Sequence, residues 1–466
     1  MRGARLAAAA LCVCLCLLGA ARVTSAASVL TLDDALARVE YHSDYQAWQE
    51  NLDGTIDARE GILDKHALTL DVSGTLLAYS YTLDTDSSKL SSAAGLSLSK
   101  STIWGTSLQG RVTPSVNLRE GSLNTTWSLE LNQTIWPRPQ YGADQIALEV
   151  NQLTRDTLIQ QRDYVVANAQ FKIERLYRAA QLAEARLALS EERLEAARQN
   201  LAVLERKRAL GEAGEMDMIS GELSVLRAER ELETSRANAA TAKRSLLEAI
   251  SLDGDYQLAP LDPSLLPEDG EEVNVERLLA AVHQHPLVLA YQVDLAKAER
   301  ELESTTAAGK PQASFRMSLA ERTTQESQGT VFEAAVTIGY PLLDGNQREK
   351  TLRNLADARD KAQESYEDAV ENVKKLIADA AAELDSLARD RQIAWLALRQ
   401  AELEWQAAQI QYHSGVIDGT SLQNAELQLK QAQLDYFESA HNYDWARRRL
   451  SLGIVGDLPE MGGAGR

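Results

Sequence analysis

Histidines and cysteines are the side chains in this sequence that could bind a metal or act as nucleophiles. His283 and His285 stand two residues apart, so on a helix they would not share a face, and no third histidine or cysteine is nearby. The other histidines are scattered, and neither a Ser-His-Asp pattern nor a glycine-rich phosphate loop is present. We therefore expect no catalytic residues, no metal site and no cofactor, and a protein that is not an enzyme.

The first residues predict a secretory signal peptide over residues 1–27. Arg2 and Arg5 supply positive charge, residues 6–21 are apolar, and small residues follow. We therefore expect a mature chain without disulfides, because the apolar part contains all the cysteines of the sequence, Cys12, Cys14 and Cys16. None of these cysteines follows a lipobox, so we do not predict a lipid anchor, and lipid anchoring stays open at this point.

The composition limits the possible partners. A formal net charge of -20 argues against nucleic acid, whose phosphates would be repelled. Beyond the predicted signal peptide there is no run of about 20 apolar residues, which a membrane-spanning helix would need. If the mature chain crosses a membrane, it must do so with β-strands whose backbone groups are all paired.

The placement of proline predicts very long helices. All 10 prolines lie outside two windows, Tyr141–Leu258 and Leu342–Leu458, which are rich in good helix formers. Each window is interrupted once by glycines, at Gly211 and Gly214 and at Gly415 and Gly419. Each therefore predicts a helix of about 70 residues, a tight turn and a helix of about 35 residues.

The two windows match each other at a constant offset of 204 residues, with Gly211 aligned to Gly415 and Glu222 to Glu426. The chain is therefore interpreted as an internal duplication. The expected domains are a first repeat at 28–252, a proline-containing linker at 253–272, a second repeat at 273–456 and a flexible tail at 457–466.

Alternation of apolar and polar residues predicts two strands in each repeat, at Ala67–Leu83, Leu123–Ile135, Gln312–Glu321 and Val331–Tyr340. The first repeat carries about 39 additional residues. They include strand-like runs at Gly95–Ser99 and Thr106–Leu118 and an expected loop at Asp84–Ser92. Whether the segment 84–122 joins the same sheet stays open at this point.

Four to six strands are too few for a closed barrel, which needs about eight. The strands of several copies would have to close together, and three copies of four would give twelve. The alternative is a soluble sheet packed on its own helices. We favour the membrane interpretation because six aromatic residues suit a membrane interface, namely Tyr79, Tyr81, Trp104, Trp127, Trp136 and Tyr340.

A seam of apolar and small residues with steps of three and four predicts that the first long helix packs against a neighbour: Ala180, Ala183, Leu187, Ser190, Leu194, Ala197, Leu201 and Leu204. The second long helix has a corresponding seam that Arg391 interrupts. The alternative for these helices alone is a free-standing antiparallel coiled coil.

With these features the chain resembles the outer membrane efflux protein family, the TolC-like channel-tunnels. The likeness rests on the repeat, on the junctions Trp136-Pro137 and Gly339–Gly345, and on the turn Tyr412–Leu422. The resemblance implies a mainly α-helical protein with β-strands. It further implies a homotrimer whose subunits share a twelve-stranded β-barrel in the outer membrane, continued by a periplasmic α-helical barrel.

The resemblance also implies roles for residues near the two helix turns. Gate or entrance positions correspond to Asp217, Tyr412, Ser421 and Asn424, although a helix cap at Asp217 and simple packing of Tyr412 are alternatives. The basic partner expected near the second turn is replaced by Ile417. Expected contacts with an adaptor protein are the turn residues Gly211, Gly214, Gly415, Val416, Ile417, Gly419 and Leu422.

The function expected from this resemblance is that of a passive exit duct in a tripartite efflux or type I secretion system. Its partners would be a periplasmic adaptor, an inner-membrane efflux pump or ABC exporter, and outer-membrane lipid. A periplasmic adaptor-like protein or a structural coiled-coil protein is the alternative. The exported substrate stays open, as does the resting state of the duct.

Overall fold

A computed structural model describes residues 29–82, 87–118, 121–138, 142–254, 256–264, 266–267, 270, 272–323, 328–340 and 345–456. The predicted signal peptide and C-terminal tail lie outside these residues. The chain divides into two compact units. The helical unit comprises Met1–Ser43, Ala169–Gly270 and Ser386–Trp445, and the sheet unit comprises Asp44–Asn168, Glu271–Asp385 and Ala446–Arg466.

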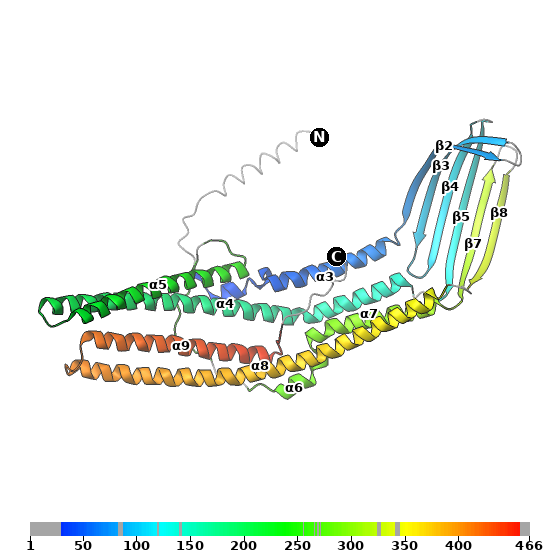
Figure 1. Ribbon diagram of the computed structural model, residues 1–466. Helices are drawn as coiled ribbons and strands as arrows, with labels where there is room; N and C mark the ends of the chain where they lie inside the picture. The colour runs from blue at the N-terminus through cyan, green and yellow to red at the C-terminus, as the bar shows by residue number, and fades with distance from the viewer. Residues whose placement is uncertain are drawn as a thin grey trace, which may run out of the picture. The chain divides into compact units, whose positions relative to one another are not determined.

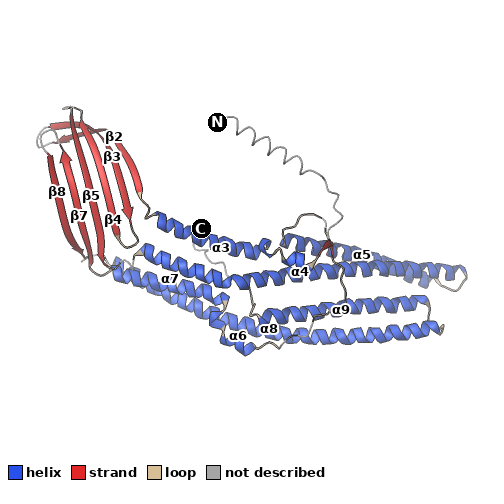
Figure 2. Ribbon diagram, turned by 180° about the vertical axis from the view of Figure 1, so that it is seen from behind, coloured by secondary structure: helices blue, strands red, loops and turns tan. Residues whose placement is uncertain are grey.

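The sheet unit contains one six-stranded antiparallel sheet (Figure 1). Its strands lie in the order β2 (Thr69–Thr82), β3 (Ser87–Ser101), β4 (Thr106–Asn117), β5 (Ser122–Trp136), β7 (Gln312–Thr323) and β8 (Gln328–Gly339). β2 and β8 form its two edges. Figure 2 shows the six strands side by side. The chain enters β2 from α3 (Ser43–Asp64) and leaves β8 toward α8 (Gln347–His413), so we call this end of the sheet proximal and the other end distal.

The two faces of the sheet differ in polarity. Register partners such as Leu70 and Leu98 point to the same side, because residues opposite each other in an antiparallel pair do so. The polar side is rich in hydroxyl groups and carries an ion pair of 3.0 Å between Arg316 Nε and Glu130 Oε1. The other side presents ten large apolar side chains that are 42–79% exposed: Leu70, Val72, Leu96, Leu98, Leu108, Val112, Leu129, Phe332, Val336 and Ile338.

Helices pack beside the proximal end within the sheet unit. These are α3, α7 (Pro286–Ala308) and the adjoining parts of α4 (Ala143–Ala209) and α8; the short α6 (Val275–Ala280) belongs to the same unit but lies away from the sheet (Figure 1). One core cluster joins α7, α8 and the chain end near Val455, and a second joins α3 to α4. In the second cluster the Trp48 indole donates a 2.8 Å hydrogen bond to the Leu158 carbonyl, so this buried N–H is satisfied.

The helical unit contains a layer of four long helical segments in the order α5 (Glu215–Ala249), α4, α9 (Gly419–Ser451) and α8 (Figure 1). Arg193 of α4 binds Glu231 of α5, whereas Arg186 of α4 binds Asp435 and Glu438 of α9. The guanidinium of Arg391 on α8 lies 4.3 Å from the centre of the Tyr443 ring on α9. α4 and α9 are therefore central, and α5 and α8 are the edges of the layer.

Two seams on α4 explain its central place. The predicted seam faces α5, where Leu201 and Leu204 lie so close to Gly221 that a Cβ there would come within 3.0 Å of both. A second seam with a strict step of seven faces α9 and was not predicted. Its buried residues form a cluster with two residues of α9: Leu182, Leu189, Ala196, Leu427 and Leu434.

The corresponding elements of the two sequence halves agree in length. α4 spans Ala143–Ala209 and α8 spans Gln347–His413, so both ends of α8 lie 204 residues after those of α4. The following helices, α5 and α9, have 35 and 33 residues. The predicted long helices and tight turns are confirmed. Among the described residues, no helix is both long and apolar enough to cross a membrane.

Three expectations need correction. The resemblance implied four strands in each copy, but the sheet has six, because the additional residues of the first half form β3 and β4. The loop expected at Asp84–Ser92 already belongs to β3 from Ser87 onward. The expected linker is not wholly irregular, since Gln257–Leu258 (β6) pairs in parallel with Val29–Leu30 (β1), beside the short helix α2 (Leu32–Leu36).

Candidate functional site: the two helix turns and the strand sheet

The turn between α4 and α5 is built by hydrogen bonds of its own backbone. Gly211 has a φ of 78°, which glycine adopts without strain, and the Glu212 N–H donates to the Lys207 carbonyl at 2.8 Å. The next helix then begins with Asp217 Oδ2 accepting a 2.8 Å hydrogen bond from the Gly214 N–H. Asp217 thus acts as a helix cap, which was the alternative to its predicted gate role.

The turn between α8 and α9 repeats this geometry. Gly415 has a φ of 72°, and the Val416 N–H donates to the Gln411 carbonyl at 2.8 Å, one repeat offset after the bond in the first turn. The start of α9 is capped by Asp418, whose Oδ1 accepts from the Ser421 N–H at 2.9 Å and from its hydroxyl at 2.8 Å. The role of Ser421 here is therefore to bind this cap.

The electrostatics of the second turn involve both hairpins. The backbone and side-chain hydrogen bonds from Ser421 lower the pKa of Asp418, and the charge of Lys207 on the first hairpin lowers the pKa further. Sequence reasoning missed Asp418. The signal that could have found it is an aspartate followed three residues later by serine at the start of a helical pattern.

The other predicted gate and contact residues lie at the surface of the same turn. Tyr412 is 46% exposed and its ring meets that of His413 edge-on, with 6.1 Å between ring centroids. Val416 is 72% exposed, Asn424 is exposed, and Ile417 and Leu422 are half-buried. The structure gives Asp217 and Tyr412 partners within their own hairpins. Their gate role stays a prediction.

The six predicted interface aromatics fall toward the two ends of the sheet. Tyr79, Tyr81 and Trp127 belong to the distal parts of β2 and β5. Near the proximal end lie Trp104, Trp136 and Tyr340. Trp127 also donates a 2.9 Å hydrogen bond from its indole N–H to Oε2 of Glu321, which is its register partner on β7. The polar group of this ring is therefore satisfied within the sheet. Their role at a membrane interface stays a prediction.

The two neighbouring histidines have separate structural partners. His285 Nε2 lies 2.8 Å from the Gly453 carbonyl, and Nδ1 accepts from the Leu287 N–H at the start of α7. Burial lowers the pKa of His285, which fits the neutral ring that these two bonds require. His283 Nδ1 instead lies 3.1 Å from the Tyr366 hydroxyl. Within the described ranges, no group of three or more histidine, cysteine or acidic side chains is arranged to hold a metal.

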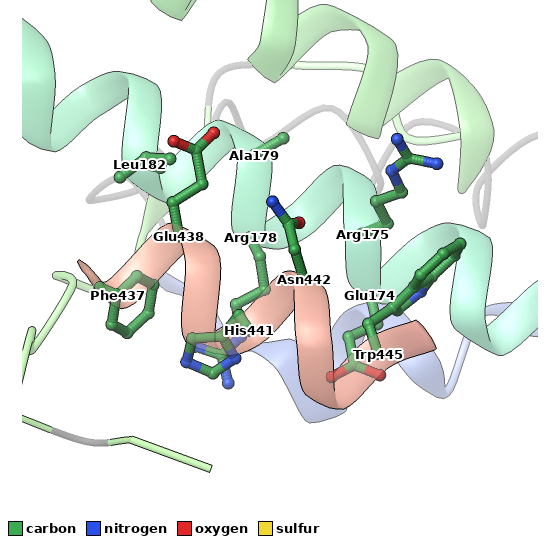
Figure 3. Close-up of a pocket in the computed structure, with 10 residues that line it drawn as sticks. All are labelled: Glu174, Arg175, Arg178, Ala179, Leu182, Phe437, Glu438, His441, Asn442 and Trp445. Carbon is green, nitrogen blue, oxygen red and sulfur yellow. The ribbon is translucent and has the colours of Figure 1, made fainter. Parts of the chain in front are cut away.

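A pocket of about 230 Å³ lies between α4 and α9 in the helical unit (Figure 3). Its aromatic residues are engaged with neighbours: the Phe437 and His441 rings are 4.2 Å apart, and Trp445 donates to the Phe171 carbonyl at 3.0 Å. The guanidinium of Arg175 lies 5.0 Å from the centre of the Trp445 ring. These contacts fasten α9 to α4.

The chain matches the family model described as outer membrane efflux protein over residues 278–453. The resemblance to the outer membrane efflux proteins is confirmed. Outer membrane protein OprJ of Pseudomonas aeruginosa is 25% identical over 293 residues, and this match covers 60% of the chain and 60% of the relative. The outer-membrane location predicted from the sequence, with a periplasmic extension, is also confirmed.

Solved structures of outer membrane channels share the fold. The CmeC channel of Campylobacter jejuni superposes with a TM-score of 0.68 at 10% identity and covers 92% of this chain and 87% of its own. The open state of the MtrE channel of Neisseria gonorrhoeae has a TM-score of 0.64 at 14% identity and covers 92% and 90%. The expected mainly helical fold with β-strands, of the channel-tunnel type, is therefore confirmed.

Proposed function

We propose that this protein is a passive exit duct of an efflux or secretion system, and not an enzyme. Three copies would close their sheets into a β-barrel in the outer membrane, and their helices would continue the duct into the periplasm. Energy for transport would come from an inner-membrane pump or ABC exporter, reached through a periplasmic adaptor. The matches to OprJ and to an outer membrane efflux family support this direction.

The observation that carries the proposal is the apolar face of the sheet. Ten large apolar side chains exposed on one face exceed what a soluble monomer presents to water. The opposite face is hydroxyl-rich, which is the alternation of a membrane barrel with lipid outside and water inside. The edges β2 and β8 carry unpaired backbone groups, which hydrocarbon does not tolerate, so neighbouring copies must pair them.

The edges of the helix layer support the same assembly. α5 carries an exposed apolar stripe at steps of three and four, formed by Met216, Ile219, Leu223 and Leu226. α8 carries another at steps of seven, formed by Leu396, Leu403 and Ile410, which are 52–71% exposed. We call these the α5 stripe and the α8 stripe. Heptad spacing is typical of a seam that packs on a second helix, and a neighbouring copy brings an α5 edge beside an α8 edge.

The alternatives fit these observations less well. A periplasmic adaptor-like protein or a structural coiled coil would account for the long hairpins and for the stripes. Neither needs a six-stranded sheet with one broad apolar face, which is an aggregation hazard in water. The turn residues around Val416 and the gate candidates Asp217 and Tyr412 keep their proposed roles in adaptor contact and opening, for which cross-linking from position 416 to an adaptor is the direct measurement.

The test is assembly and conductance of the mature protein in mild detergent, with a matched pair of variants on β5. Leu129→Arg places a charge on the apolar face, where it would cost about 2–4 kcal/mol at the middle of a membrane. Ser128→Arg places the same charge on the polar face. We expect the wild type and Ser128→Arg to form conducting trimers that insert into outer membrane, and Leu129→Arg to insert poorly.

Two results would contradict the proposal. One is a wild-type protein that is monomeric without detergent and conducts no ions in planar bilayers. The other is equal insertion of the two arginine variants, because the two faces of the sheet would then have the same surroundings.

A further inference from the structure

The number of strands that each copy contributes determines how wide a shared barrel would be. In this protein each copy has six strands in its sheet. β3 pairs with β2 over twelve positions from Thr69↔Ser99 to Thr82↔Ser87, and β4 pairs with β5 over twelve positions from Thr106↔Gln133 to Asn117↔Ser122. These ladders are as long as those that join β5, β7 and β8. The added hairpin is thus an integral part of the sheet and not an appendage on its surface.

Because six is an even number, copies can also join without interrupting the antiparallel order of neighbouring strands. Neighbouring strands are antiparallel throughout, so β2 runs from the proximal to the distal end and β8 runs the opposite way. The β8 edge of one copy and the β2 edge of the next therefore form another antiparallel pair, as membrane barrels require. Three copies give eighteen strands.

Eighteen strands enclose a wide lumen. With strands about 4.8 Å apart and tilted by about 40°, the radius of the backbone cylinder is roughly 1 Å per strand. Eighteen strands give a radius of about 18 Å and twelve give about 12 Å. After side chains are added, the free radius is about 12 Å in the first case and about 6 Å in the second.

The distal end carries connections that are too short to cover such an opening. Only four residues separate β2 from β3, β4 from β5, and β7 from β8. Four residues reach about 14 Å when fully extended, so a loop that leaves the rim and returns extends only about 7 Å inward. The rim of the wider barrel would therefore stay open.

The lining of the lumen is close to neutral. On the polar face of the sheet, Glu130 is neutralised by Arg316 at 3.0 Å, and Asp71 and Glu333 are offset in part by Arg111. Most of the other residues on this face are serine, threonine, asparagine and glutamine. A lumen of this kind does not sort solutes by charge, and its width does not sort small ones by size.

We propose that the membrane part of this duct is an eighteen-stranded, permanently open barrel that admits hydrated solutes of about 10 Å radius, so that selection by size takes place in the helical part. This inference rests on the proposed trimeric duct. The eighteen strands differ from the twelve that the family resemblance implies. The difference is due to the hairpin β3–β4, which would widen the distal opening of the barrel.

The first experiment counts strands with engineered disulfides in the full chain, on a background in which the cysteines at positions 12, 14 and 16 are serine. Asp71→Cys on β2 is combined with one second cysteine at a time. Ser97→Cys is the register partner on β3 and the positive control, and Asn132→Cys lies on β5, which only a four-stranded sheet would bring beside β2. Ala335→Cys and Thr337→Cys on β8 sample the contact between copies.

The outcomes separate the inference from the proposed function. We expect bonds within one chain for Asp71→Cys with Ser97→Cys, and a ladder of dimers and closed trimers with the β8 positions. A bond within one chain between Asp71→Cys and Asn132→Cys, in a protein that still forms trimers, would overturn the eighteen strands and leave the duct standing. The β2–β3 bond without any bond between copies would overturn the shared barrel itself.

The second experiment measures the opening from outside intact cells. Ser128→Cys in the middle of β5 points into the proposed lumen, and Leu129→Cys next to it points to lipid. We expect maleimide-polymer reagents of about 10 Å radius to label Ser128→Cys and to leave Leu129→Cys unlabelled. Labelling of Ser128→Cys only by reagents below about 6 Å would contradict the wide barrel.

Discussion

α4 and α8 occupy corresponding places in the two sequence halves and both have 67 residues, but they are packed differently. In the stretch of α4 from 182 to 209 five residues are buried, whereas in the corresponding stretch of α8, from 386 to 413, only Ala401 and Ala408 are buried. In these stretches α4 has α5 on one side and α9 on the other, whereas α8 has α9 as its one neighbour among the described helices of this unit. One copy thus completes the surroundings of α4 and leaves those of α8 incomplete.

The difference teaches that two helices of the same length and repeat position can serve different contacts. The two seams of α4 pack within one copy and specify its fold, whereas the α8 stripe is left exposed by one copy and is available to a neighbouring copy. Arg391 illustrates this, because it takes the place that Leu187 has in α4 and stacks on Tyr443 where a leucine would bury itself between helices. Variants of matched chemistry in α4 and α8 should therefore separate folding from assembly.

The largest effect is expected for charges in the α8 stripe. In the double variant Leu396→Asp and Leu403→Asp, two carboxylates would have to be buried in the seam between copies, at a cost of several kcal/mol each. We expect the trimer to be lost while the helical content of the protein is kept. Native mass spectrometry in detergent measures the first quantity, and far-ultraviolet circular dichroism measures the second.

A control for this variant is available on the same helix. Ala397 is exposed and lies about 100° around the helix from Leu396, off the face of the α8 stripe, so Ala397→Asp should leave the trimer intact. If the double variant assembles as well as Ala397→Asp, the α8 stripe does not face another copy, and the contrast between the two helices reflects nothing more than their different exposure.

A smaller effect is expected when leucines are truncated to alanine, and here the variant on α4, not the one on α8, should lose stability. Leu189 on α4 is 6% exposed within the cluster that joins α4 to α9, and Leu189→Ala should lower the free energy of unfolding by about 2–4 kcal/mol. Leu396 on α8 is 53% exposed, and Leu396→Ala should change the stability of the dissociated chain by less than about 0.5 kcal/mol. Denaturant titration of detergent-dissociated monomer compares the two. Equal losses would contradict the edge position of α8.

The sequence predicted the long helices well, because the absence of proline and the strong helix formers are local signals. It predicted only one of the two α4 seams. The seam of Leu182, Leu189 and Ala196 was missed because Arg186 and Arg193 lie beside it, and arginines suggest a solvent-exposed face. In the structure these arginines cross to acidic groups on α9 and α5, and such partners are visible only once the helices are arranged.

The same limit applies to the sheet and to the turns. The run Ser87–Gly95 is made of serine, alanine and glycine with a single lysine and a single leucine, which is typical of a loop, yet it pairs with β2 and in part with β4. Pairing on both sides overrides weak strand propensity. At the turns the glycines were predictable from their positive-φ role. The capping by Asp418 was not predicted, because its two hydrogen bonds from Ser421 depend on where α9 begins.

The smallest effect is expected at the helix starts that follow α4 and α8, where Asp217 and Asp418 act as caps. Loss of a cap typically costs about 1 kcal/mol, so Asp217→Ala and Asp418→Ala should each lower stability by about that amount. The pKa of Asp418 is lowered in the folded protein, so its contribution is fully present above the ordinary aspartate pKa of about 3.9. It is lost as the pH falls through the lowered value.

The measurement is the unfolding free energy of wild type and Asp418→Ala between pH 3 and pH 7. The difference between the two should be constant at the upper end of this range and should shrink below a pH of about 4. Asp418→Asn keeps an acceptor oxygen for Ser421 and removes the charge, so it should retain most of the stability and lose the pH dependence. A difference between wild type and Asp418→Ala that grows as the pH falls would contradict the capping role, because a protonated carboxyl binds the two Ser421 donors less strongly than a carboxylate does.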